Sequence, residues 1–129
     1  MSEPRWLTKD QIVRIHAEQL AAFGGPAGIR DEAMLESAVA CPQNKWGYRE
    51  QDLAVLAAAY AYGIARNHPF VDGNKRAAFM ALVVFLRKSG VTFAPDGSEA
   101  VVAILGLATG EIGEEGLARW IRDRWPAVP

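Results

Sequence analysis

Residues 53–86 read LAVLAAAYAYGIARNHPFVDGNKRAAFMALVVFL, two apolar runs on either side of a short polar break. The first run, 53–65, is rich in alanine and has no proline, and the second, 77–86, is apolar on every face. A helix that is apolar all round must be enclosed by other elements. Neither run reaches the roughly 18 apolar residues that a membrane span needs. The stretch therefore predicts two buried core helices, over about 51–67 and 74–89.

The polar break, residues 67–76, combines turn chemistry with charged side chains. Pro69 disfavours helix at the residue before it, and the Asp-Gly-Asn sequence at 72–74 is typical of a turn, with an Asp or Asn available to cap the next helix. Lys75 and Arg76 then fall in the first helical turn, where the macrodipole favours anions. Two cations that oppose the helix dipole indicate a ligand, and free backbone N–H groups beside them suit a phosphate.

Two more side chains of the break complete a site for phosphate chemistry. Asp72 is suited to hold Mg²⁺, which commonly binds one or two carboxylates together with phosphates and water. Histidine titrates near neutral pH, so His68 is a candidate general base for an incoming hydroxyl. These parts predict phosphoryl or nucleotidyl transfer. Plainer roles stay open: a helix end for His68, a helix cap for Asp72, and a solvated helix start for the two cations.

The pattern His68-Pro69-Phe70-x-Asp72-Gly73-Asn74-x-Arg76 resembles the signature of the Fic superfamily. The AMP-transferring members of that superfamily have Gly where this chain has Lys75, and a second Arg where it has Phe79. Both departures resemble the Doc (death-on-curing) toxins. The resemblance to Doc extends over nearly the whole chain, including Phe23-Gly24-Gly25-x-x-Gly28, Phe85-Leu86-Arg87-x-x-Gly90-Val91 and Ala108-Thr109-Gly110-Glu111-Ile112.

The Doc resemblance implies an all-α fold: one compact domain over residues 1–129, with about six helices and at most a small β-hairpin flap. It also implies a toxin that uses ATP and Mg²⁺ to phosphorylate a threonine of elongation factor Tu, so that translation stops. A cognate antitoxin would hold such a toxin inactive. Two alternatives stay open, a Fic-type AMP transferase and a non-catalytic binding module of the same fold.

Carried over residue by residue, the resemblance makes His68 the base and Asp72 the Mg²⁺ ligand, with Phe70 as the buried anchor of the loop. Arg66 matches an Arg of Doc and either reaches a phosphate or caps backbone carbonyls. A long cation at the Lys75 position favours attack on the γ-phosphate. The phosphate cradle implied by the resemblance consists of Gly73, Asn74, Lys75 and Arg76.

The flanking sequence predicts the remaining helices from their start and stop signals. A capping box at Thr8-x-x-Gln11 begins one helix, which Gly24-Gly25 ends. Asp31 can cap a short helix through Ala40, ended by the Cys41-Pro42 pair. Two further helices are expected over about 99–108 and 114–125. The loop at 42–50 has the composition of a recognition loop, and in Fic-like proteins the corresponding connection forms a flap that aligns the target. Its candidate contact residues are Lys45, Trp46 and Tyr48, with an ordinary connector as the alternative.

The chain has 129 residues, half of them apolar, and a net charge of −1. It can bury a core without disulfides or metals. Cys41 is its single cysteine, and the distant His16 and His68 leave no zinc pattern, so we expect His16 to be a packing or surface residue. No signal-peptide apolar region opens the sequence, which makes the cytoplasm the expected compartment. Arg and aromatic residues alternate over 119–125, but the acidic balance argues against nucleic acid as a direct partner, and no membrane contact is expected.

Overall fold

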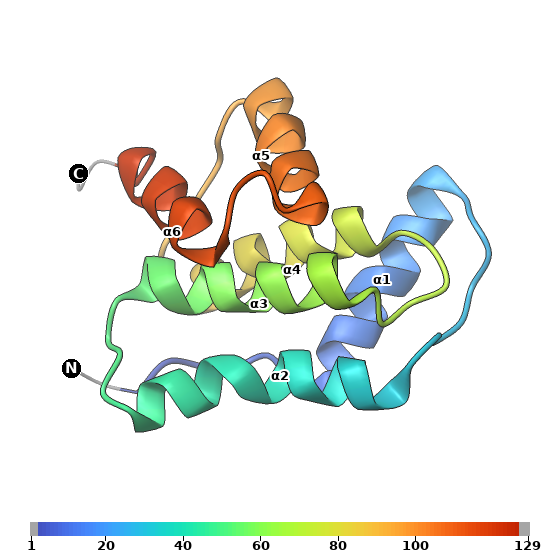
Figure 1. The fold of residues 1–129 in the computed structure, drawn as a ribbon, viewed down its shortest axis with the longest axis horizontal. Helices are drawn as coiled ribbons and strands as arrows, with labels where there is room; N and C mark the ends of the chain where they lie inside the picture. Colours follow the sequence, from blue (N-terminus) through green and yellow to red (C-terminus); the bar gives the residue numbers. More distant parts are fainter. Residues whose placement is uncertain (1–2, 127–129) are drawn as a thin grey trace.

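The two apolar runs form adjacent helices at the centre of the fold, α3 (Leu53–Asn67) and α4 (Asn74–Lys88). The computed structural model describes residues 3–126, and within them α3 packs against α2, α4, α5 and α6 (Figure 1). Ten of the fifteen residues of α3 are buried, as a helix enclosed by neighbours requires. The predicted central pair is therefore confirmed, with bounds within two residues of the expected ones.

Four more helices complete the described residues: α1 (Lys9–Phe23), α2 (Glu32–Gly47), α5 (Gly97–Thr109) and α6 (Glu114–Asp123). In Figure 1, α2 lies along one side of α3, and α5 and α6 lie on the other. The fold class is all-α, as expected. Within residues 3–126, the only β-type pairing is an isolated antiparallel bridge between Ile29 and Phe70. No helix in this part of the chain combines the length and the apolar character needed to cross a membrane.

Helix α2 runs past the point where the sequence predicted its end. We expected it to stop at Ala40, yet it continues through Pro42 to Gly47. Proline inside a helix removes one backbone hydrogen bond but leaves its own carbonyl available. The buried positions Leu35, Ala38 and Pro42 follow helical spacing along the face that packs against α3, so tertiary burial outweighs the local cost. The predicted recognition loop is consequently helical over 42–47, and the small hairpin flap that the sequence allowed does not form there.

A close contact brings α2 and α3 together. A Cβ added at Gly63 would lie 2.9 Å from the Cβ of Ala38, too close for two carbon atoms. Glycine within a helix costs about 1 kcal/mol relative to alanine. Here its missing side chain lets the two helix backbones approach, so this glycine serves packing.

The N-terminal segment is fixed to the core by a buried tyrosine. The backbone N–H of Leu7 donates to the hydroxyl of Tyr60 at 2.9 Å, and that hydroxyl lies 3.4 Å from the carbonyl of Leu7. Burial raises the pKa of Tyr60 to about 12, against the smaller opposite effect of the Leu7 hydrogen bond. The capping box predicted at Thr8 and Gln11 follows at once and is confirmed at the start of α1.

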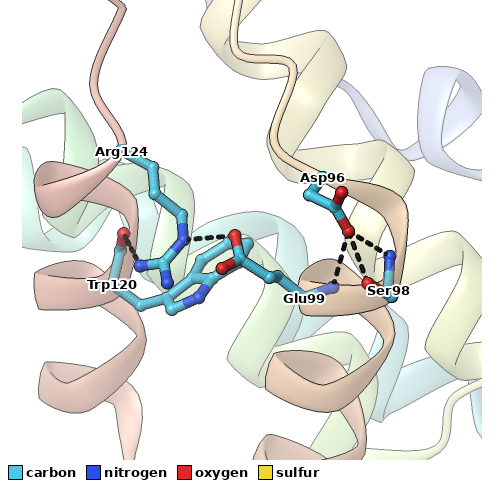
Figure 2. Close-up of polar contacts among 5 residues, drawn as sticks. All are labelled: Asp96, Ser98, Glu99, Trp120 and Arg124. Carbon is cyan, nitrogen blue, oxygen red and sulfur yellow. Dashed lines mark hydrogen bonds and ion pairs between the residues drawn. The ribbon is translucent and has the colours of Figure 1, made fainter.

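Figure 2 shows how the start of α5 is closed and tied to α6. The carboxylate of Asp96 accepts hydrogen bonds from the backbone N–H groups of Ser98 and Glu99, at 2.9 and 3.4 Å, and from the Ser98 hydroxyl at 2.5 Å. Arg124 of the C-terminal end of α6 donates to Glu99 at 3.0 Å, and its guanidinium lies 4.8 Å from the ring centre of Trp120. The Ser98 hydroxyl, followed by the two N–H groups, lowers the pKa of Asp96.

Candidate active site

The connection between α3 and α4, residues 68–73, is the site loop. It begins at His68, which ends α3 in the left-handed conformation, with φ 49° and ψ 58°. The imidazole is exposed and lines a hollow of about 280 Å³. The other lining residues of this hollow are Val71, Asp72, Gly73, Asn74, Lys75 and Arg76. The structure thus gathers His68, Asp72, Lys75 and Arg76 around one opening.

Asn74 holds the shape of the site loop. Its side-chain amide donates to the carbonyl of Phe70 at 2.9 Å, and its side-chain oxygen accepts from the N–H of the same residue at 3.0 Å. Asn74 is buried, so both bonds are shielded from water. Its side chain is therefore committed to the loop, and only its backbone N–H can contribute to the predicted phosphate cradle.

Phe70 is buried, as expected of a loop anchor, and it rests on a histidine of α1. The rings of Phe70 and His16 stack with their centres 3.7 Å apart and an angle of 4° between the planes. His16 Nε2 lies 2.7 Å from the carbonyl oxygen of Asp72, to which it must donate. Sequence reasoning gave His16 no such role. Its signal was its place on the apolar face of α1, four residues after the buried Ile12.

The start of α4 has no side-chain cap. Gly73 occupies the N-cap position with φ 76°, and within the described residues no side chain accepts a hydrogen bond there. The plainer alternative for Asp72, a helix cap, is not what the structure has, because a left-handed residue intervenes and the Asp72 side chain lies against Gly25. The first helical N–H groups have no partner inside the helix, so at residues 74–76 they remain available to an anion. Lys75 and Arg76 stand in this same turn.

The end of α1 lies beside two charged side chains of the site, Asp72 and Arg76. A Cβ at Gly25 would lie 2.5 Å from Asp72 Oδ2, so the exposed carboxylate rests against this glycine. Arg76 Nη2 donates to the carbonyl of Gly24 at 3.3 Å, and its guanidinium lies 5.6 Å from the ring centre of Phe23. The Gly-Gly stop of α1 therefore leaves room for Asp72 and orients Arg76.

Four other predicted site residues lie outside this hollow. Arg66 donates to the carbonyl of Ala108 in a long bond of 3.5 Å, at the end of α5, and its phosphate role stays a prediction. Lys45 pairs with Glu114 at 2.9 Å, and that hydrogen bond raises its pKa. Within α2 and the turn after it, Trp46 packs against the core and Tyr48 is 89% exposed. The structure does not bring Lys45, Trp46 or Tyr48 to the hollow.

Comparisons with known proteins identify the family of this chain. The model of the Fic/DOC family matches residues 6–86, which include the site loop. A protein of Escherichia phage P1 named "Protein kinase doc" is 32% identical over 119 residues, covering 92% of this chain and 94% of that protein. A protein of Mycolicibacterium smegmatis named "Toxin Doc" is 46% identical over 77 residues, 58% of this chain and 59% of that protein. Sequence, site and relatives together show that this chain belongs to the Fic/Doc family.

Proposed function

We propose that this protein is a toxin kinase of Doc type, which transfers the γ-phosphate of ATP to a threonine of elongation factor Tu and so blocks translation. The observation that carries the proposal is the hollow of about 280 Å³ shared by an exposed imidazole and an uncapped, cationic helix start. The phage P1 relative, similar over 92% of this chain, carries the name of a protein kinase.

In this proposal the start of α4 binds the phosphates of ATP. The open N–H groups of its first turn and the positive end of the helix dipole favour negative charge, and Lys75 and Arg76 add to it. His68 takes the proton of the threonine hydroxyl while the hydroxyl oxygen bonds to the γ-phosphorus. The bond from that phosphorus to the β,γ-bridging oxygen breaks, and ADP leaves. Positioning and charge stabilisation supply most of the catalysis in such a transfer.

The side chains of the site fit Mg²⁺ that arrives with the nucleotide. Within residues 3–126, no three His, Cys, Asp or Glu side chains gather into a metal site of their own. Asp72 supplies one exposed carboxylate at the edge of the hollow. Mg²⁺ commonly takes one or two carboxylates and completes its shell with phosphates and water. Bound in this way, the ion would neutralise part of the phosphate charge.

Lys75 separates the proposed kinase from a nucleotidyl transferase. It is exposed and lines the hollow at the second residue of α4, where a long cation occupies space that a glycine would leave open. Phe79, one turn later, packs against the core and offers no second guanidinium. Both features favour attack on the γ-phosphate over transfer of AMP.

Two partners follow from the proposal. Elongation factor Tu is the protein substrate, met in the cytoplasm. A cognate antitoxin holds the toxin inactive, through a disordered tail that folds on binding near the site.

Intact-mass measurement tests the proposal directly. The purified protein and its His68→Ala variant are incubated with ATP, Mg²⁺ and elongation factor Tu. A gain of about 80 Da on the target that requires His68 is the expected result, since a phosphate adds this mass. A gain of about 329 Da would establish AMP transfer instead. No gain with either protein would contradict the proposed substrate.

A further inference from the structure

The segment that precedes α2 runs beside the site loop and is hydrogen-bonded to it. The N–H of Arg30 donates to the carbonyl of Pro69 at 2.7 Å, and the N–H of Val71 donates to the carbonyl of Gly28 at 3.0 Å. The bridge between Ile29 and Phe70 lies between these two bonds. Backbone pairing therefore holds residues 28–30 against the loop that follows His68.

The side chain of Arg30 extends this contact to the end of α3. Its Nε donates to the carbonyl of His68 at 2.6 Å, and its Nη2 donates to the carbonyl of Asn67 at 2.7 Å. With its backbone N–H on Pro69, Arg30 thus satisfies three consecutive carbonyls. The guanidinium supplies two donors in a fixed fork, and a cation is favoured at a helix C-terminus.

His68 needs such support because its backbone is strained. A non-glycine residue with φ 49° occupies a sparsely populated region. Conformations of this kind are costly and persist only where surrounding contacts fix them. The carbonyls on both sides of the His68 φ and ψ angles, those of Asn67 and His68, are the two that the guanidinium holds. The contact therefore fixes the direction in which the imidazole leaves the backbone.

We infer that Arg30 is a positioning residue for His68, acting through the backbone and without touching substrate. Arg30 does not line the hollow, which separates it from the proposed phosphate-binding cations. The activity readout of this inference rests on the proposed function, whereas its structural readout does not.

The activity test compares Arg30→Ala with Arg30→Lys and with Arg14→Ala, which removes an exposed arginine of α1. Misplacement of a reacting group by about 1 Å can cost about 100-fold, so we expect kcat to fall by about 10- to 100-fold in Arg30→Ala. The KM for ATP should stay within about twofold, because phosphate binding is untouched. Lysine lacks the fork and should restore activity only partly, and added guanidinium ion should partly rescue Arg30→Ala. An unchanged kcat, or a kcat loss matched by lost ATP binding, would overturn the inference.

A second measurement needs no activity. In ¹⁵N-histidine-labelled protein, the ring signals of His68 and His16 are followed by NMR, with thermal unfolding as a check on folding. Arg30→Ala should shift or broaden the signals of His68 and leave those of His16 in place, with recovery on adding guanidinium ion. Unchanged His68 signals would refute the positioning role. If the unaltered protein modifies no target, the proposed function fails while this readout still decides the inference.

Discussion

The starts of α5 and α4 both leave backbone N–H groups without a partner inside the helix, and the two starts treat these groups in opposite ways. At α5, the carboxylate of Asp96 accepts from two of the first N–H groups and closes the helix end (Figure 2). At α4, the N-cap is a left-handed glycine without any side-chain bond, and two cations follow. A helix start that serves stability supplies its own anion, whereas one that serves a ligand leaves the place for it open.

A carboxylate placed at the start of α4 should remove this difference and have the largest effect on ATP binding. Gly73→Asp would put a carboxylate at the N-cap, and Asp tolerates the left-handed conformation better than most residues. The carboxylate would compete with phosphate for the same N–H groups and repel it. We therefore expect ATP affinity, measured by calorimetry, to fall by about 100-fold, or about 2.7 kcal/mol.

The control for this change is Gly73→Ala. It brings the same backbone strain at φ 76° and the same Cβ, which would lie 3.3 Å from Leu20 Cδ2, but no charge. ATP affinity should fall much less than with aspartate. Equal losses in both variants would show that space at Gly73, and not an open helix start, explains binding.

Displacing Asp72 separates the contribution of Mg²⁺ to ATP binding from the contribution of the helix start. The Cβ of Gly25→Ala would meet Asp72 Oδ2 at 2.5 Å and push the carboxylate aside. We expect the gain in ATP affinity from Mg²⁺ to shrink by about tenfold, while affinity without Mg²⁺ is kept. Gly24→Ala is the matched control, since φ is also positive there and a Cβ meets nothing within 4 Å. The same loss in both variants would remove the proposed metal role of Asp72.

Removing the cap of α1 should affect stability alone. Thr8→Ala deletes the side chain that accepts from the N–H of Gln11 at 3.1 Å. Loss of an N-cap costs about 1 kcal/mol, which corresponds to a Tm roughly 4 °C lower for a domain of this size. Thr8→Ser, which keeps the hydroxyl, should stay close to the unaltered protein in thermal unfolding. A clear loss of ATP affinity in Thr8→Ala would contradict the separation of the two kinds of helix start.

The smallest expected effect is the pH dependence of the α5 cap. Hydrogen bonds from Ser98 hold the pKa of Asp96 below its ordinary 3.8, so the unfolded chain binds the proton more readily. The stabilisation is therefore present above the unfolded value and is lost as pH falls through the lower folded value. The Tm advantage over Asp96→Ala should shrink between about pH 5 and about pH 2. A constant advantage across this range would show that the carboxylate charge contributes nothing.

Helix positions were predictable because caps and apolar periodicity are local signals. The capping box at Thr8 and the two runs around the site loop gave α1, α3 and α4 nearly to the residue. The end of α2 was missed because the burial of Pro42 against α3 is a tertiary effect. The hairpin flap that the sequence allowed is absent for the same reason, since residues 42–47 are helical.

The sequence predicted which neighbouring residues form the candidate site, but not which distant residues hold it in shape. His68 and residues 71–76 line one hollow because they are close in sequence and bounded by two rigid helices. The residues that hold the loop were not predictable in their roles. Arg30 and His16 lie 38 and 56 positions from the carbonyls that they bond, and no local pattern reports such a pairing. The inward turn of the Asn74 amide likewise depends on how the loop folds.

The hydrogen bonds from Arg30 and His16 to the site loop join residues far apart in the sequence, which bears on the order of folding. Bringing Arg30 and His16 to the site loop closes chain segments of 38 and 56 residues, which include α2 and α3. Contacts that close long segments form after local helices, because the entropy of closure must be met first. We therefore expect the site loop to reach its final arrangement only after α2 and α3 have formed. On the proposed function, a chain still leaving the ribosome would stay inactive until that arrangement is complete.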